Sequence, residues 1–194
     1  MTYPLSKLVH DIHQCTLCAA HLPLPPKPIF QFHSSARILI AGQAPGRITH
    51  HKGRPFDDPS GKRLRSWMGI SDDLFYTPEL VAILPMGMCY PGTLAGGDLP
   101  PRPECAPKWR AALLSHLPNL ELVLVIGKYA HSFHISEKPS SVTALVHNWR
   151  TYAPSMFPLP HPSPRNISWL RKNPWFEAET IPALQAQVNA IVQI

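Results

Sequence analysis

The sequence lacks long hydrophobic runs, an export signal and low-complexity segments. No apolar run in its 194 residues approaches the ~18 residues that a membrane-spanning helix needs. The first residues, Met-Thr-Tyr-Pro-Leu-Ser-Lys, do not show the basic and then apolar pattern of a signal peptide. The 24 prolines are dispersed, and no internal repeat is present. We therefore expect a soluble cytoplasmic protein in which residues 1–194 form a single domain with a sizeable core.

Two common catalytic signatures are also missing. No Lys-Ser or Lys-Thr pair follows the glycines of a phosphate-binding loop, and the chain contains no Gly-x-Ser-x-Gly motif. These absences argue against a nucleotide-binding protein of the P-loop type and against a hydrolase with that serine nucleophile. Negative charge is scarce as well, because 12 Asp and Glu face 18 Lys and Arg, for a formal net charge of +6. This balance favours a polyanionic partner such as nucleic acid.

The apolar residues predict alternating strands and helices. Short apolar runs bounded by Gly or Pro are typical of strands buried on both faces of a parallel sheet, and apolar residues at helical spacing predict amphipathic helices. We expect strands over 38–41, 80–84, 122–126 and 156–159, helices over 4–14, 62–68, 109–117 and 181–191 and from Lys128, a helix or strand over 143–149, and a loop over 90–107. This order predicts an α/β fold with three αβα layers around a central parallel sheet of about four strands.

Two motifs begin where predicted strands end. Residues 42–46 (GQAPG) follow the first strand, and their glycines permit a close approach of the backbone to a ligand. Residues 161–166 (HPSPRN) follow the last strand. Because ligands bind beyond the carboxyl ends of parallel strands, we expect the two motifs to meet at one cleft. Taken alone, GQAPG is equally compatible with a strand-ending turn that carries no site.

The chain has four cysteines, Cys15, Cys18, Cys89 and Cys105. Without an export signal, a disulfide framework is not expected. A C-x2-C pair followed much later by two cysteines with fifteen residues between them matches neither a zinc ribbon nor a dense ferredoxin run. From the spacing alone, three interpretations stay open: an iron–sulfur site with four thiolates, a zinc site, or four unrelated buried thiols.

Three separated parts of the chain together resemble the bacterial and archaeal iron–sulfur uracil-DNA glycosylases. Residues 42–61 are similar to that family's first motif, in which a GEAPG loop is followed by GRPF, here residues 53–56, and then by a turn that ends in Gly, here Gly61. The HPS of residues 161–163 matches the second motif, and HPSPRN is similar to the single-strand-selective branch of the superfamily. The cysteine pattern resembles the family's cluster ligands.

This resemblance implies a uracil-DNA glycosylase-like fold and a [4Fe–4S] cluster held by Cys15, Cys18, Cys89 and Cys105. It also implies a DNA repair enzyme, acting as a monomer on DNA that contains uracil. The enzyme would flip uracil out of the DNA and hydrolyse its N-glycosidic bond, which leaves an abasic site.

The resemblance further implies roles for individual residues. Phe56 would stack on the flipped base, with an ordinary core Phe as the alternative. A neutral His161 would donate a hydrogen bond to the uracil oxygen, helped by backbone N–H groups near Gln43. The catalytic candidates are His161, Gln43 and His50, and the substrate-binding candidates are Gly42, Ala44, Pro45, Gly46, Phe56, Met86 and Gly87.

DNA contacts are expected from small and basic residues around the two motifs. Serines would contact the phosphates beside the flipped nucleotide, and Lys and Arg would attract the backbone, although the same charges also suit a solvated surface. One residue of 164–167 would fill the gap in the base stack. The DNA-binding candidates are Ser60, Gly61, Lys62, Arg63, Ser163, Pro164, Arg165 and Asn166.

The chain departs from the family pattern at two places. Gln43 stands where the family has Glu, and His50 stands at an acidic position, so neither place supplies a carboxylate for the attacking water. His50, His51, Asp57 or Asp58 are candidates to replace it, or backbone groups alone hold the water. The family's Asn that reads the uracil edge is replaced within residues 85–88, where main-chain groups would then read the base. A catalytically weak or inactive DNA-binding relative and a glycosylase for a different deaminated base therefore stay open as alternatives.

Overall fold

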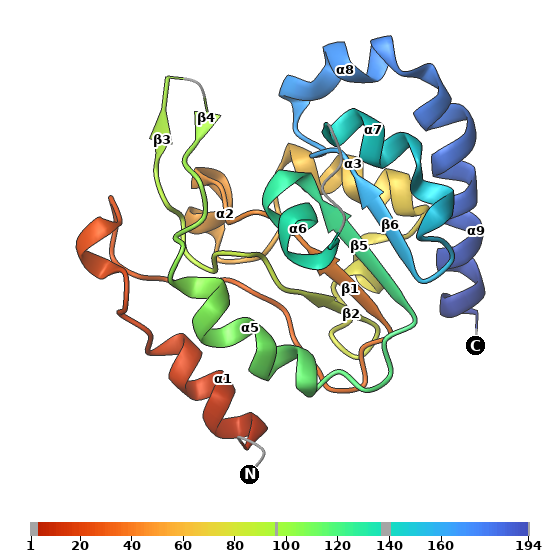
Figure 1. Cartoon of the computed structure of the whole chain (residues 1–194). Coiled ribbons are helices and arrows are strands. Elements are labelled where there is room, and N and C mark those ends of the chain that lie inside the picture. The colour runs from red at the N-terminus through yellow and green to blue at the C-terminus, as the bar shows by residue number, and fades with distance from the viewer. Residues whose placement is uncertain (1–3, 96, 137–140, 194) are drawn as a thin grey trace.

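A sheet of four parallel strands lies at the centre of the computed structural model, which describes residues 4–95, 97–136 and 141–193 (Figure 1). The strand order is β2 (Val81–Ile83), β1 (Ile38–Ala41), β5 (Leu122–Ile126) and β6 (Met156–Leu159). Three strands have the predicted bounds, and β2 is one residue shorter at each end. The predicted α/β fold with a central parallel sheet is confirmed.

Helices cover both faces of this sheet. One face packs against α3 (Pro59–Met68), α4 (Asp72–Phe75), α7 (Val142–His147) and α9 (Ile181–Val192). The other packs against α1 (Leu5–His13), α5 (Cys105–Ser115) and α6 (Gly127–His134). Side chains alternate along a strand, so Ile38 and Ile40 enter the first layer while Leu39 enters the second. Within the described residues, no helix is both long enough and apolar enough to cross a membrane.

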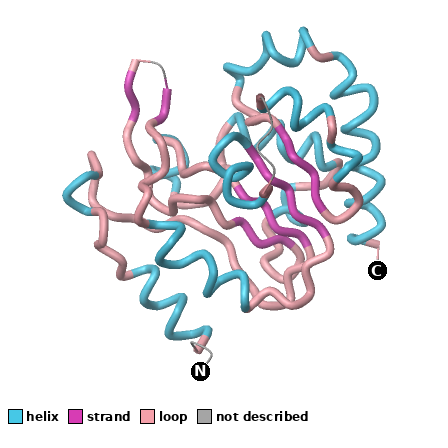
Figure 2. The backbone as a smooth tube through the Cα atoms, in the orientation of Figure 1, coloured by secondary structure: helices cyan, strands magenta, loops and turns pink. Residues whose placement is uncertain are grey.

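The structure differs from the sequence prediction mainly in the connections. The expected loop over 90–107 contains an antiparallel hairpin of β3 (Thr93–Leu94) and β4 (Gly97–Asp98), and α5 already begins at Cys105. Figure 2 shows this hairpin standing away from the sheet. Two further helices, α2 (Arg47–Lys52) and α8 (Ile167–Lys172), follow the two motifs. Short 3₁₀ turns lie at Ala19–His21, Trp149–Thr151 and Pro164–Asn166, and a π-helical turn, Phe176–Thr180, leads into α9.

Candidate active site

A cavity of about 430 Å³ lies where the strands end. Its walls come from residues 42–49 after β1, from residues 55, 56 and 58–60 at the start of α3, from Pro85 after β2, and from residues 161 and 163–165 after β6. Thr93 and Asp98 of the hairpin complete it. The predicted meeting of the two motifs at one cleft is therefore confirmed. The volume falls in the ~300–1,000 Å³ range of small-molecule sites.

Main-chain hydrogen bonds hold the loop 42–46 in place. The Met86 N–H donates to the Gly42 carbonyl at 2.9 Å, and the Gly87 N–H donates to the Gln43 carbonyl at 3.0 Å. The Gln43 side-chain amide donates to the Leu99 carbonyl at 3.3 Å. Met86 and Gly87, which we predicted to bind substrate, are not among the residues that line the cavity. Their N–H groups support the glycine loop instead of facing a ligand.

Phe56 lines the cavity in a backbone conformation that is rare for a bulky residue. Its φ is 54°, in the left-handed region. Arg65 Nη1 donates to the Phe56 carbonyl at 3.2 Å, and a Cβ at position 61 would overlap that carbonyl. The Phe56 ring meets Phe75 edge-on, with 6.3 Å between centroids. Gly61, predicted as a DNA contact, thus allows α3 to begin directly against Phe56.

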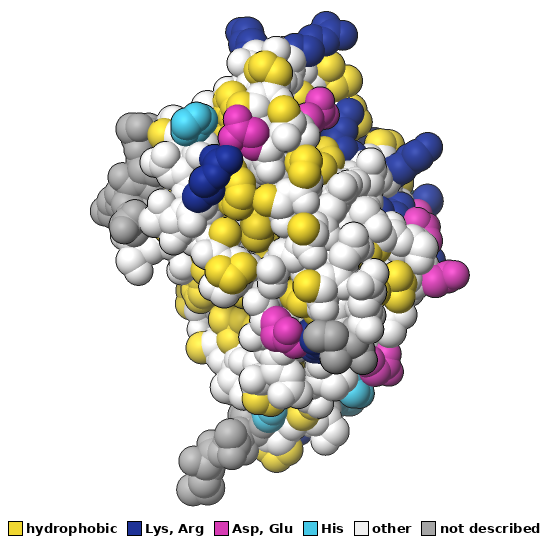
Figure 3. All heavy atoms as spheres, turned by 90° about the vertical axis from the view of Figure 1, so that its right-hand side faces the viewer, with side chains coloured by type: hydrophobic (Ala, Val, Ile, Leu, Met, Phe, Trp, Pro, Cys, Tyr) yellow, Lys and Arg dark blue, Asp and Glu magenta, His cyan; other side chains and the backbone are white. Residues whose placement is uncertain are grey.

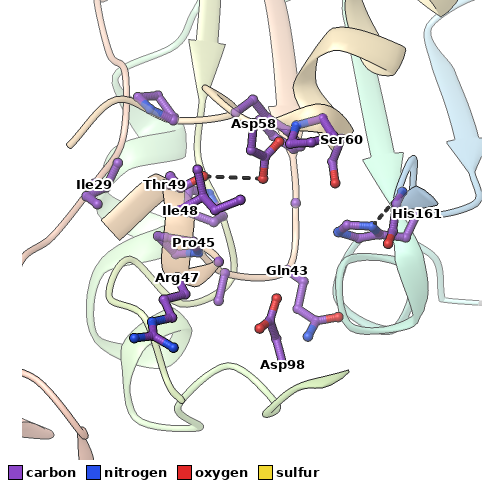
Figure 4. A pocket seen from close by; sticks show the side chains of 18 of the residues that line it. Ile29, Gln43, Pro45, Arg47, Ile48, Thr49, Asp58, Ser60, Asp98 and His161 are labelled. Carbon is purple, nitrogen blue, oxygen red and sulfur yellow. Dashed lines mark hydrogen bonds between the residues drawn. The ribbon is translucent and has the colours of Figure 1, made fainter. Parts of the chain in front are cut away.

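His161 points into the cavity with one ring nitrogen already fixed (Figure 4). The Ser163 N–H donates to His161 Nδ1 at 3.2 Å, so in the neutral ring Nε2 carries the hydrogen. Burial lowers the pKa of His161, while the carboxylates of Asp58 and Asp98 act in the opposite direction. A neutral imidazole near pH 7 therefore presents Nε2–H as a donor.

Polar side chains hold the segment that carries His161. Asn166 Nδ2 donates to the His161 carbonyl at 2.7 Å, and Arg63 Nη1 donates to the Ser163 carbonyl at 2.9 Å. Both residues were predicted to bind DNA, and in the structure both position this loop. The predicted DNA contacts that line the cavity are Ser60, Ser163, Pro164 and Arg165, whereas Lys62 is exposed on α3.

Within the described residues, two carboxylates line the cavity, Asp58 and Asp98. Asp58 is the N-cap of α3, where its Oδ1 accepts from the Gly61 N–H at 2.8 Å and its Oδ2 from the Thr49 hydroxyl at 3.4 Å. Asp98 Oδ1 accepts from the Thr93 hydroxyl at 2.8 Å. Asp57 instead pairs with Lys52 at 2.9 Å. Sequence reasoning missed Asp98, whose place depends on the hairpin.

His50 is not brought to this cavity. It lies on α2, with its ring centroid 5.9 Å from that of Tyr90, and its carbonyl accepts from Lys27 Nζ at 2.8 Å. Burial lowers the pKa of His50, and the charges of Lys27 and His51 lower it further. Of the three predicted catalytic residues, the structure therefore groups Gln43 and His161 and separates His50 from them.

The four cysteines line a second, smaller cavity of about 20 Å³. None of them forms a disulfide. The Met88 N–H donates to Cys105 Sγ at 3.4 Å. Burial raises the pKa of Cys89 to about 12 and that of Cys105 to about 11. Across the residues that the structure describes, no group of three or more His, Cys, Asp or Glu side chains is gathered closely enough to hold a metal ion as it stands.

A buried cation lies on the same helix as Cys105. Arg110 is 2% exposed, and its Nη1 donates to the Leu84 carbonyl at 2.9 Å. Its Nη2 bonds to His134 Nε2 at 2.5 Å. Burial lowers the pKa of Arg110 to about 10, and the Cys105 thiol opposes this effect. No carboxylate among the described residues pairs with Arg110.

Basic side chains surround the second motif. Arg165 and Arg47 line the cavity, and α8, which directly follows the motif, carries exposed Arg171 and Lys172. In Figure 3, Lys and Arg side chains stand along the top of the molecule, at the height of α8. This side of the molecule is therefore suited to attract a polyanion.

A family model of the uracil DNA glycosylase superfamily matches residues 30–185. The match covers most of the chain and includes the glycine loop, Phe56 and His161. Cys15 and Cys18 precede the matched residues, whereas Cys89 and Cys105 lie within them. The chain therefore belongs to the uracil DNA glycosylase superfamily.

Proposed function

We propose that the protein is a DNA glycosylase that flips uracil out of DNA and hydrolyses its N-glycosidic bond, which leaves an abasic site. The observation that carries this proposal is the meeting of Phe56, His161 and the glycine loop in one cavity at the strand ends. The cavity has an aromatic wall on which a base can stack and a fixed donor for the oxygen of that base. Membership of the superfamily supports the same class of reaction.

His161 would act on the leaving base. As the bond from the sugar C1′ to the base nitrogen breaks, negative charge develops on the base and positive charge on the sugar. The Nε2–H of a neutral His161 would donate to the uracil oxygen, where this charge is greatest. Ser163 keeps the ring in the required tautomer, because its N–H occupies Nδ1.

DNA would approach over the second motif. Ser60 and Ser163 at the cavity wall are small donors for the phosphates on either side of the flipped nucleotide. Arg165 and the basic end of α8 would add attraction to the backbone. Ile167, the first residue of α8, is 41% exposed, and this large apolar side chain of the segment 164–167 would fill the gap in the stack.

We also propose that Cys15, Cys18, Cys89 and Cys105 hold a [4Fe–4S] cluster, as in the iron–sulfur branch. The four thiols line one cavity and form no disulfide, and the Sγ atom of Cys105 accepts a main-chain N–H. Such a set of donors fits an iron–sulfur cluster. The anionic cluster would also offset the charge of Arg110, which has no carboxylate partner among the described residues. When bound, the cluster would tie the N-terminal segment to the loop between β2 and α5.

A second candidate function is DNA binding without efficient excision. Gln43 favours it, because this side chain provides no carboxylate for the attacking water and its amide is bonded to Leu99. Such a protein would keep Phe56 and the basic surface and would still capture the flipped base.

An excision assay separates these functions. Purified protein is incubated with an end-labelled duplex or single strand that carries one uracil, and abasic sites are then cleaved with alkali. Strand scission supports the glycosylase, and a shifted band in a gel without scission supports the DNA-binding protein. Scission only when hypoxanthine or xanthine replaces uracil assigns a different deaminated base. If the DNA shows no scission and its band does not shift, both functions are contradicted.

A further inference from the structure

We propose that Asp98 on β4 supplies the carboxylate that orients the attacking water and takes its proton. This inference rests on the proposed function, since it assigns a residue to the same hydrolysis. It accounts for the presence of Gln43 where a carboxylate is expected.

The position of Asp98 suits this role. Its carboxylate lines the same cavity as His161, and Figure 4 shows it beside the side chain of Gln43. Asp98 Oδ2 lies 3.3 Å from where a Cβ on Gly46 would stand, so the carboxylate reaches the glycine loop itself. Gly46 leaves the room that this approach needs.

One oxygen of Asp98 is held and the other is available. Oδ1 accepts from the Thr93 hydroxyl at 2.8 Å, which itself lies 2.6 Å from the hydroxyl of the buried Tyr90. Because Thr93 donates to Asp98, Tyr90 must donate to Thr93, which fixes the direction of this chain. Among the described residues, no hydrogen bond reaches Oδ2, which can therefore accept from a water molecule.

Asp58, the other carboxylate at the cavity, is already used. Both of its oxygens accept hydrogen bonds, from the Gly61 N–H and from the Thr49 hydroxyl, and they hold the start of α3. A water bound there would have to compete with the helix cap. Asp98 has no such competing role.

The hairpin is fixed relative to the second motif. Gly97 has a φ of 133°, and a Cβ at this position would overlap Arg165 Nη1, so the guanidinium lies directly on the hairpin backbone. Thr93 pairs with Asp98 across the hairpin. The hairpin that carries Asp98 therefore contacts the segment that carries His161, and both residues line the same cavity.

The proposed hydrolysis adds one water molecule across the N-glycosidic bond. The bond between C1′ and the base nitrogen breaks, and its electron pair leaves with the base, whose oxygen accepts from His161. A lone pair of the water oxygen forms the new bond to C1′, and the water proton passes to Asp98 Oδ2. Asp98 then releases this proton to solvent, and the uracil anion takes up a proton from solvent. The products are uracil and an abasic sugar with a hydroxyl on C1′.

The test compares Asp98→Asn with the unchanged protein in single-turnover excision of uracil. We expect the rate to fall by about 10²-fold or more, because general-base assistance contributes ~10²–10⁴. Affinity for an abasic-DNA product should stay the same or increase, because a negative charge facing the DNA is removed. Thr93→Val should lower the rate less, since Asp98 keeps its charge but loses its orientation. Asp73→Asn, an exposed Asp on α4, is the matched control.

The possible results distinguish a failure of the role assigned to Asp98 from a failure of the glycosylase function. If the unchanged protein excises uracil and Asp98→Asn excises it equally fast, Asp98 is not the base, although the glycosylase function stands. A large loss in Asp58→Asn without one in Asp98→Asn transfers the role to Asp58. Equal losses of rate and of DNA affinity in Asp98→Asn would make Asp98 structural. If the unchanged protein excises nothing, the proposed function fails and this assignment falls with it.

Discussion

The two cavities of this molecule differ in what holds their residues in place. The larger one is framed by the main chain: Met86 and Gly87 N–H groups bind the glycine loop, and Gly61 lets α3 press against Phe56. The cysteine cavity instead takes thiols from positions that span residues 15 to 105. The first is therefore shaped before any ligand arrives. In the part of the chain that the structure describes, the thiols do not form a metal site as they stand, so the proposed cluster would have to draw them together.

Removal of one thiol should have the largest effect, and this effect should be confined to the cysteine cavity. In Cys89→Ser, we expect iron to fall from about four atoms per chain to almost none, with loss of a broad absorption band at about 400 nm. Excision per folded molecule should stay near that of the unchanged protein, because Cys89 does not line the larger cavity. Iron analysis and visible spectra after anaerobic purification measure the change, with Thr16→Ser as control. A folded, colourless and iron-free unchanged protein would contradict the cluster.

The complementary change acts on the larger cavity alone. His161→Ala should lower the single-turnover rate of uracil excision by about 10²-fold or more, as loss of one oxyanion donor does in other enzymes. Iron content should not change. The exposed His10→Ala is the control. An unaffected rate would assign His161 a purely structural role.

A third change tests whether the main chain shapes the larger cavity. Gly61→Ala should reduce the free energy of unfolding by ~1–3 kcal/mol, because the new methyl group must displace the Phe56 carbonyl. Excision should fall by a larger factor than stability explains, since the aromatic wall moves. Chemical denaturation and the excision assay report the two effects, and Ser66→Ala on the same helix should stay within ~0.5 kcal/mol. Unchanged stability in Gly61→Ala would show that the loop yields easily.

The smallest effect concerns pH on the cysteine side. Burial and, to a smaller extent, the charge of the neighbouring Arg110 together lower the pKa of His134 to about 3. Between pH 6.5 and that value the unfolded chain binds a proton that the folded chain does not. The free energy of unfolding should therefore decrease as the pH is lowered, by up to about 1.4 kcal/mol per pH unit for this group. Denaturation from pH 7 to pH 5 should show a shallower fall in His134→Gln, and the same slope as the unchanged protein in His10→Gln. Equal slopes in all three would exclude His134 as the cause.

The sequence predicted the layers of this fold because the central strands are continuous apolar runs. Ile38–Ala41 and Leu122–Ile126 are buried on both faces, which explains why their sequences are apolar throughout. A Gly residue directly follows each run and marks the end of the strand in the sequence. The hairpin gave no comparable signal. Its strands have two residues each, and the pairing of Thr93 with Asp98 depends on their position beside the cavity rather than on an apolar pattern. Helix α2 was also missed, because Thr49 is its one buried residue.

The same distinction applies to the candidate site. Residues next to a strand end, such as Gln43 and His161, were identified from the motifs. Asp98 was not, since it reaches the cavity only through the hairpin. Arg63 and Asn166 were identified as polar residues near the motif, but their hydrogen bonds to loop carbonyls cannot be read from residue type.

The bonds that join the glycine loop to the loop after β2 involve no side-chain atom. Residue types at positions 43 and 86 can therefore change while the frame persists, whereas position 87 is confined to glycine by Pro101, which a Cβ would approach to 2.9 Å. Substitutions at position 43 should thus leave the main-chain support of the larger cavity intact.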